Sequence, residues 1–171
     1  MKHLWSPWRL EYLTAPKVEG CVFCHAVGGN DDRENLVLLR GKHAFLILNR
    51  FPYNNGHFMV VPYEHVPSLE DLDAPTLTEM MLLLNQGLAA LRTAMHPEGF
   101  NVGANLGQVA GAGIEEHVHI HAVPRWGGDT NFMPVVGDMR VVPETWKQTY
   151  DGLKAALDGQ QQPRISGEET S

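Results

Sequence analysis

Residues 117–123 read His-Val-His-Ile-His-Ala-Val, and this alternation constrains the fold more than any other part of the chain. Side chains of a β-strand point to opposite faces in turn, so histidines at every second position occupy one face at steps of roughly 7 Å. Val118, Ile120 and Ala122 then point to the other face, which we expect to be the core. The pattern therefore predicts a strand with one apolar face and one row of imidazoles.

Other strand signals predict an antiparallel sheet around it. Short aliphatic runs are separated by glycines or by the turn sequence Pro-Tyr-Asn-Asn-Gly, as in a β-meander. A glycine-rich loop precedes the histidine row. Strands are expected at residues 36–40, 43–49, 57–62, 100–105 and 117–123.

Helix signals predict one long and one short helix. Apolar residues recur at alternating spacings of four and three over residues 77–95. Leu82 and Leu83 widen the apolar face beyond one stripe, which is typical of a helix that is covered on a second side, and a homodimer would provide that cover. A second apolar pattern over residues 146–157 predicts the short helix near the C-terminus.

Length and cysteine content predict one α+β domain in a reducing compartment. A chain of 171 residues can bury a core without disulfides. We expect an N-terminal aromatic arm over residues 1–20, a single domain over 21–157 and a polar tail over 158–171. Two cysteines and the lack of an apolar leader at the start indicate the cytoplasm.

Charge and hydropathy narrow the class of partners. The net charge of -7 argues against a nucleic-acid surface, which normally contains a basic stripe. The apolar stretches are shorter than the roughly 20 residues that a membrane span requires. An anionic substrate would therefore be held by local donors such as backbone amides, imidazoles or a single arginine.

The histidine row has three interpretations: a metal site, a nucleophile with helpers, or solvated strand residues. Exposed strand positions more often carry Thr, Lys or Glu, which disfavours the third. Neighbouring histidines of the row are also too far apart for all three to bind one ion at the roughly 2 Å of a Zn–N bond. We therefore expect the three histidines to have different tasks.

Cys21-Val-Phe-Cys24 is a second candidate site. Two thiolates at this spacing can bind one zinc ion at roughly 2.3 Å, and histidines are the available type for the two missing ligands. The alternatives are a redox pair or two buried thiols. The pair does not open an obvious helix after a strand, as a redox motif would, so we prefer zinc.

Two loops offer groups for a nucleotide. Residues 107–113 contain three glycines, whose backbone N–H groups could hold an oxyanion, although a flexible hairpin loop is the alternative. In residues 49–57, Asn49 offers a donor and an acceptor to a sugar diol, and His57 begins the next strand. The intervening Asn-Asn-Gly is ordinary turn sequence.

Together these features resemble the histidine triad superfamily of nucleotide hydrolases and transferases. The row over residues 117–121 resembles its signature, residues 49–57 its ribose and phosphate segment, and residues 105–107 its second nucleotide contact. The Trp-Ser-Pro-Trp-Arg sequence at residues 5–9 and the Pro-Arg-Trp-Gly-Gly-Asp sequence from residue 124 are similar to the bacterial diadenosine polyphosphate branch. That branch includes phosphorylases and hydrolases.

The resemblance implies an antiparallel α+β fold whose sheet continues across a homodimer. It implies a structural zinc and no organic cofactor. By resemblance the two cysteines and two histidines, one just after the third strand and one at the start of the row, would bind the zinc. These are Cys21, Cys24, His65 and His117.

The resemblance also implies a reaction. His119 would attack an α-phosphorus to form a nucleotidyl-histidine, so it must be neutral, with its second ring nitrogen donating to a backbone carbonyl. His121 and His57 would donate to the phosphate oxygens. The implied nucleotide contacts are Asn49, Asn105, Gly107, Gly113 and His121.

One departure concerns the phosphate. Other branches carry a glutamine and a hydroxyl residue shortly before the row, whereas this chain has Glu115 and Glu116, which we expect to face solvent. The expected function is nucleotidyl transfer or hydrolysis of dinucleoside polyphosphates such as diadenosine tetraphosphate. The alternatives are a phosphoramidate or diadenosine triphosphate hydrolase, and a nucleotide-binding zinc protein without catalysis.

Overall fold

The structure, a computed structural model, describes residues 20–129 and 145–161. The predicted aromatic arm, apart from Gly20, and the predicted tail beyond residue 161 therefore lie outside the described residues. Within the described ranges, no helix combines the length and the apolar character that a membrane crossing requires.

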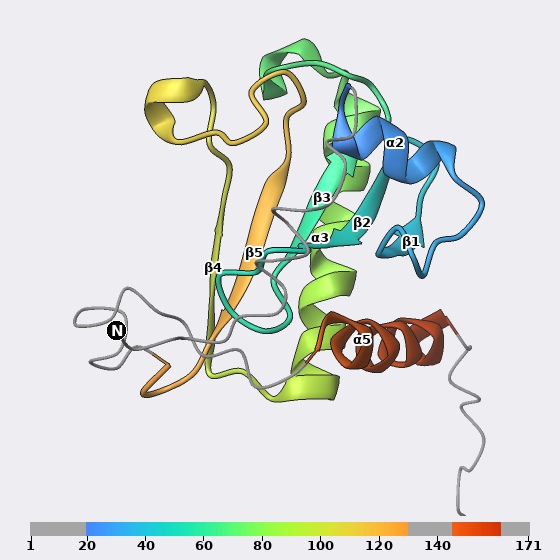
Figure 1. The fold of residues 1–171 in the computed structure, drawn as a ribbon, viewed down its shortest axis with the longest axis vertical. Helices are drawn as coiled ribbons and strands as arrows, with labels where there is room; N and C mark the ends of the chain where they lie inside the picture. The colour runs from blue at the N-terminus through green and yellow to red at the C-terminus, as the bar shows by residue number, and fades with distance from the viewer. Residues whose placement is uncertain (1–19, 130–144, 162–171) are drawn as a thin grey trace, which may run out of the picture.

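Five strands form one antiparallel sheet in the order β1-β2-β3-β5-β4 (Figure 1). The predicted α+β class with an antiparallel sheet is confirmed, and β1, β2 and β3 are the predicted meander. Strand β5 carries the last histidine of the row and lies between β3 and β4, so both of its edges are paired. The strands are β1 (Val37–Arg40), β2 (Ala44–Leu48), β3 (Phe58–Pro62), β4 (Gly99–Gly103) and β5 (Ile120–Arg125).

The predicted triad strand begins later than expected. Strand β5 starts at Ile120, opposite Val60, so His117 and His119 precede the paired part of the strand. The ladder stops because β3 ends at Pro62, which has no N–H to donate. The row is instead fixed by a hydrogen bond from the N–H of Val118 to the carbonyl of Val66.

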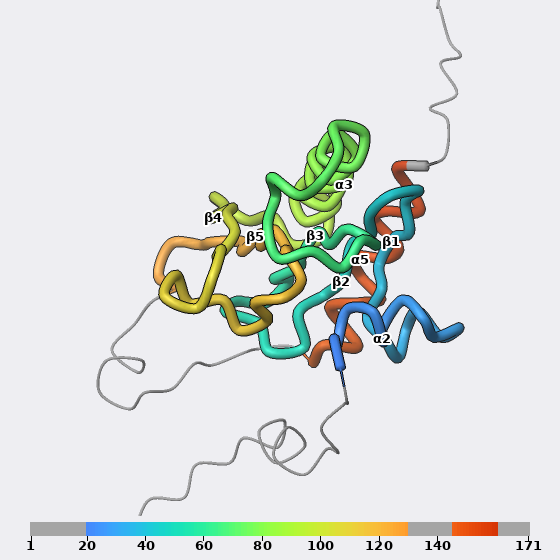
Figure 2. Tube along the Cα trace, turned by 90° about the horizontal axis from the view of Figure 1, so that it is seen from above, coloured from blue at the N-terminus to red at the C-terminus, as the bar shows by residue number. Residues whose placement is uncertain are grey.

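The long helix α3 (Ala74–Met95) forms where the sequence predicts it. Asp73 caps its N-terminus by accepting a 2.8 Å hydrogen bond from the N–H of Thr76. The helix packs against β2 and β3 (Figure 2). It approaches the sheet closely at Gly87, where an added Cβ would lie 2.4 Å from Cζ of Phe58.

The C-terminal helix α5 (Trp146–Gln161) packs against α3 and β1. It is longer than predicted, since it includes residues 158–161, which the sequence places in the tail. Tyr150, Leu153 and Leu157 are buried, as their spacing indicates. The hydroxyl of Tyr150 donates a 3.0 Å hydrogen bond to the carbonyl of Val37, which joins α5 to the edge of the sheet.

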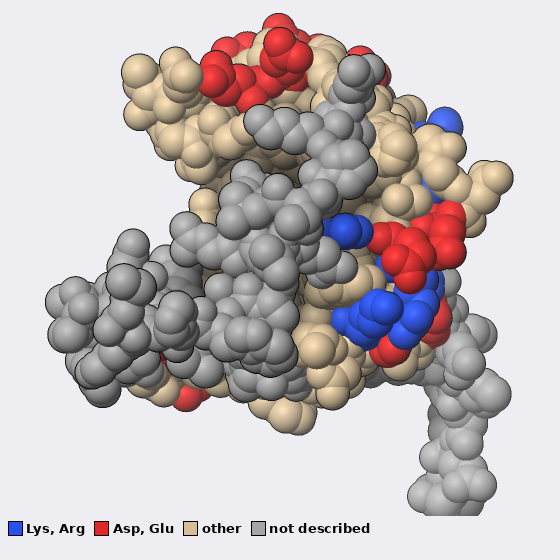
Figure 3. All heavy atoms as spheres, in the orientation of Figure 1, with Lys and Arg blue, Asp and Glu red and all other residues tan. Residues whose placement is uncertain are grey.

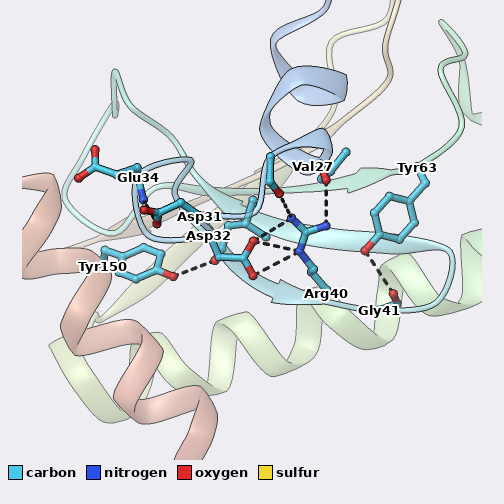
Figure 4. Close-up of polar contacts among 10 residues, drawn as sticks. Val27, Asp31, Asp32, Glu34, Arg40, Gly41, Tyr63 and Tyr150 are labelled. Carbon is cyan, nitrogen blue, oxygen red and sulfur yellow. Dashed lines mark hydrogen bonds and ion pairs between the residues drawn. The ribbon is translucent and has the colours of Figure 1, made fainter.

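A short helix, α2 (Val22–Gly28), begins at the cysteine pair and is not predicted from the sequence. Arg40 of β1 holds its C-terminal end by donating to the carbonyls of Val27 and Gly29 at 3.1 and 3.3 Å (Figure 4). The same guanidinium forms an ion pair of 2.8 Å with Asp32. Two 3₁₀ turns, η1 (Leu69–Asp71) and η2 (Gln108–Ala110), complete the described fold.

Candidate functional site

The four residues expected to bind zinc lie together. Their nearest potential ligand atoms are all within 4.8 Å of one another. Nδ1 of His117 lies 3.2 Å from Sγ of Cys21 and 3.6 Å from Sγ of Cys24, and Nδ1 of His65 lies 3.3 Å from Sγ of Cys24. Zn–S bonds of about 2.3 Å and Zn–N bonds of about 2.0 Å in a tetrahedron require ligand separations close to these.

The tautomer of His117 suits a metal ligand. Its Nε2–H donates a 2.9 Å hydrogen bond to the carbonyl of Pro62, which leaves Nδ1 as the unprotonated nitrogen facing the thiols. Both cysteines are free thiols, so no disulfide competes for this geometry. The residues present therefore fit a structural Cys₂His₂ zinc site. Glu116 is exposed as expected, with a carboxylate oxygen 3.9 Å from Nε2 of His65.

His119 lies next to this cluster and makes the backbone hydrogen bond that a nucleophilic histidine requires. Its Nδ1–H donates to the carbonyl of His117 at 2.9 Å. The Nε2 atom therefore carries the lone pair. Burial lowers the pKa of His119, against the effect of this hydrogen bond, so the ring is neutral near pH 7.

His57 and His121 form a second pair of rings beside His119. Nδ1 of His57 accepts a 3.1 Å hydrogen bond from the N–H of Tyr53, so its Nε2 carries the proton and donates to Nδ1 of His121 at 3.0 Å. His121 must then carry its own proton on Nε2. The rings of His119 and His121 lie 4.7 Å apart between centroids and nearly perpendicular, at 80°.

Both rings are held neutral. Burial, followed by repulsion from His121 and His119, lowers the pKa of His57 to about 3. Burial and repulsion from His119 lower the pKa of His121 to about 4. At neutral pH the site therefore presents uncharged imidazoles, one with a free lone pair and one with an outward N–H.

The other expected nucleotide contacts have local roles in the structure. Asn49 accepts a 2.9 Å hydrogen bond from the N–H of Phe51, and its amide lies 3.3 Å from Nδ1 of His57. Asn105 donates to the carbonyl of Gly111 at 3.4 Å across the glycine-rich loop. Gly107 has a φ of 80°, a backbone conformation that favours glycine. Gly113 has open space around it, since an added Cβ there would meet nothing within 4 Å.

The structure buries His57 and directs its ring N–H to the histidine row. The side chain is fully buried, and its only ring N–H is donated to His121. In this geometry it contacts the row rather than an exposed phosphate position. The sequence predicts His57 as a site residue but does not show its contact with a second histidine.

Two contributors are missed by the sequence reasoning. Tyr53 fixes the tautomer of His57 through its backbone and stacks on that ring at 5.0 Å between centroids. Phe23, inside the cysteine pair, contacts the rings of His117 and His119. One feature of the sequence could have indicated Phe23: it is an aromatic residue inside the candidate metal motif.

Charged side chains form local pairs around the fold. On the face shown in Figure 3, one group of lysine and arginine side chains lies beside acidic ones. Two ion pairs, of Arg33 with Asp151 and of Arg40 with Asp32, each have an N–O distance of 2.8 Å.

Comparison with known proteins identifies the family of the chain. A family model described as HIT domain matches residues 30–128. The chain is 40% identical over 157 residues to a protein of Mycobacterium tuberculosis named AP-4-A phosphorylase, covering 87% of this chain and 80% of that protein. It is 27% identical over 121 residues to an adenosine 5'-monophosphoramidase of Saccharomyces cerevisiae, covering 67% of this chain and 72% of that protein.

Solved structures agree with the sequence comparison. A structure described as a Zn-bound histidine triad family protein from Mycobacterium smegmatis superposes with a TM-score of 0.67 at 28% identity, covering 82% of this chain and 95% of that one. The fold, the row of histidines and the matched residues lead to one conclusion. The chain belongs to the HIT, or histidine triad, family.

Proposed function

We propose that the protein transfers a nucleotidyl group from a dinucleoside polyphosphate, such as diadenosine tetraphosphate, through a covalent intermediate on His119. The observation that carries the proposal is the hydrogen bond from Nδ1–H of His119 to the carbonyl of His117, which leaves Nε2 as a neutral nucleophile. The 40% identity to the protein named AP-4-A phosphorylase supports this substrate class.

The proposed reaction has two displacements. Nε2 of His119 attacks the α-phosphorus, an N–P bond forms, and the P–O bond to the leaving nucleotide breaks. The imidazole then carries a positive charge, which the carbonyl of His117 stabilises through the Nδ1–H. In the second step an oxygen of the acceptor, water or inorganic phosphate, bonds to the phosphorus as the N–P bond breaks. The proton of the acceptor passes to solvent, and His119 leaves as the neutral imidazole.

The neighbouring histidines support both displacements. The Nε2–H of His121 donates to a phosphate oxygen as charge develops, and backbone amides near Gly113 assist. His57 acts as a positioning residue, since its ring fixes the tautomer of His121. Asn49, Asn105 and Gly107 complete the proposed nucleotide contacts.

The proposed zinc is structural. Cys21, Cys24, His65 and His117 would bind it, and the ion would hold the segment before β5 against α2. It supplies no chemistry to the displacements above. No organic cofactor is part of the proposal.

We also propose that the protein is a cytoplasmic homodimer of one domain, with limits near residues 21 and 157. Met81 and Leu82 on α3 are 50% and 56% exposed, and Val102 on the edge strand β4 is 47% exposed. Apolar side chains at such positions are typical of a covered face. Light scattering of the purified protein would give the mass in solution.

Two other functions would use the same site residues. The yeast relative named a monophosphoramidase favours a hydrolase of phosphoramidates, and a hydrolase of diadenosine triphosphate would differ only in substrate length. A nucleotide-binding zinc protein without turnover would need neither the free Nε2 of His119 nor its fixed tautomer. The geometry therefore favours an enzyme.

The test is product analysis of diadenosine tetraphosphate turnover with and without inorganic phosphate. ADP and ATP formed only with phosphate identify a phosphorylase, whereas AMP and ATP in both conditions identify a hydrolase. The His119→Ala variant should bind AMP but form neither set of products. Unchanged turnover by this variant would exclude His119 as the nucleophile.

A further inference from the structure

Phe23 lies between the two cysteines in the sequence and against two histidines in space. Its ring centroid is 5.4 Å from that of His117, in an edge contact at 76°, and 4.9 Å from that of His119, at 55°. The side chain is 2% exposed. One ring of the cysteine motif therefore packs against both a candidate zinc ligand and the proposed nucleophile.

One hydrogen bond and two ring contacts help to orient His119. Its Nδ1–H is fixed to the carbonyl of His117, and the ring of His121 lies 4.7 Å away. The ring of Phe23 is a further packing contact. Rotation of the imidazole about its bond to Cβ would move Nε2, and a displacement of about 1 Å at a reacting atom costs about 10²-fold in rate.

The position of Phe23 depends in turn on the Cys/His cluster. Helix α2 has seven residues, too few to be stable without tertiary contacts. Cys21 and Cys24 face His117 and His65 at its N-terminal end, and Arg40 holds the carbonyls at its C-terminal end. If the thiols separate from the histidines, the first turn of α2 loses its attachment, and Phe23 lies in that turn.

We propose that Phe23 is a positioning residue that connects the Cys/His cluster to His119. The packed cluster fixes the first turn of α2, the turn fixes the ring of Phe23, and that ring limits rotation of the nucleophile. The zinc site then affects the rate of nucleotidyl transfer as well as the stability of the fold. This inference rests on the proposed function, which makes His119 the nucleophile.

The test compares Phe23→Leu with Phe45→Leu. Phe45 is fully buried in β2 and its ring stacks on Tyr63 at 5.3 Å, so its substitution makes the same chemical change in the core at a different contact. Native protein and both variants are studied with zinc and after removal of zinc by a chelator. The measurements are the single-turnover rate of nucleotide attachment to His119 by mass spectrometry, the Kd of AMP, and the rate of His119 modification by diethyl pyrocarbonate.

In the native protein and in Phe45→Leu, removal of zinc should slow nucleotide attachment about tenfold, while the Kd of AMP changes less than about twofold. Phe23→Leu should attach nucleotide about tenfold more slowly than the native protein even with zinc present. Removal of zinc should then slow its attachment little further. The modification rate of His119 should follow the same pattern. A merely structural role would instead lower the melting temperature of both variants without this difference between them.

The proposal is overturned if Phe23→Leu and Phe45→Leu attach nucleotide at the same rate, or if zinc removal slows both variants equally. If none of the three proteins attaches a nucleotide to His119, the proposed function fails. The rate of His119 modification by diethyl pyrocarbonate still tests the inference. Zinc-dependent modification in native protein and Phe45→Leu, with no zinc dependence in Phe23→Leu, would support the connection. The same zinc dependence in all three proteins would exclude it.

Discussion

The Nε2–H of His57 donates a 3.0 Å hydrogen bond to Nδ1 of His121, across a sequence separation of 64 residues. The direction of this bond is fixed by the N–H of Tyr53, which donates to the other nitrogen of His57. A backbone amide thus determines, through two rings, that His121 presents a proton on its outward nitrogen. The orientation of the proposed phosphate donor is therefore set by a backbone amide in the loop over residues 49–57.

The first prediction concerns this pair of rings. His57→Phe fills the buried space but removes the donor to His121, so kcat should fall about 10–100-fold while KM changes less than about threefold. Steady-state kinetics on diadenosine tetraphosphate would measure both. His43→Phe, at the turn before β2, is the matched control and should keep the native kcat. A native kcat for His57→Phe would rule out its positioning role.

The second prediction is a loss of stability in acid. The pKa of His57 is about 3 and that of His121 about 4 in the folded protein, below the 6.5 expected in the unfolded chain. Between these values the unfolded chain binds more protons, so the free energy of unfolding falls as the pH decreases from 6.5 toward 4. The stabilising contribution is complete above pH 6.5.

Denaturant unfolding at several pH values would measure this slope. His57→Gln removes one of the two titrating groups, so its unfolding free energy should depend less steeply on pH than that of the native protein. Equal slopes for the two proteins would show that His57 is not a source of the acid sensitivity.

The third prediction concerns the metal. Protein purified without an affinity tag should contain about one zinc per chain, and Cys21→Ser should lower both the zinc content and the melting temperature. Elemental analysis and thermal unfolding would measure these. Metal-free native protein with an unchanged melting temperature after chelator treatment would restore the interpretation of a redox or buried thiol pair.

The fourth prediction concerns the far end of α2. Arg40→Lys keeps the charge but loses the forked donation to the carbonyls of Val27 and Gly29, so α2 should be held less firmly. We expect zinc affinity to fall about tenfold, as for other groups that orient metal ligands. Competition with a chromophoric chelator would measure it. Arg33→Lys, which alters an exposed ion pair with Asp151, should leave zinc affinity unchanged.

The fifth prediction compares two helical glycines. Gly87→Ala places a Cβ 2.4 Å from Cζ of buried Phe58, so overpacking of about 1–3 kcal/mol should outweigh the gain in helix propensity and lower the melting temperature. Gly152→Ala in α5 meets nothing within 4 Å and should raise it by a few degrees. Thermal unfolding would show the opposite signs, and a rise for both variants would contradict the close packing of α3 on the sheet.

The sequence predicts the elements whose signals are local and periodic. The aliphatic runs of β1, β2 and β3 and the helical spacing of α3 are each visible within one segment, because burial of one face imposes a period on that segment. The alternating histidines likewise predict the row, and their spacing predicts a different role for each histidine. By contrast α2 is too short to show a period, and the late start of β5 depends on Pro62 in another strand.

The sequence by itself determined the antiparallel α+β class, the family resemblance and the residue types available for zinc and for nucleophilic attack. Only the tertiary structure decided which ring nitrogen each histidine presents, because each tautomer depends on a partner: Pro62 for His117, a backbone carbonyl for His119, and Tyr53 through His57 for His121. Apart from the carbonyl for His119, these partners are distant in the sequence, and no local pattern encodes a hydrogen bond that exists only after the sheet has formed.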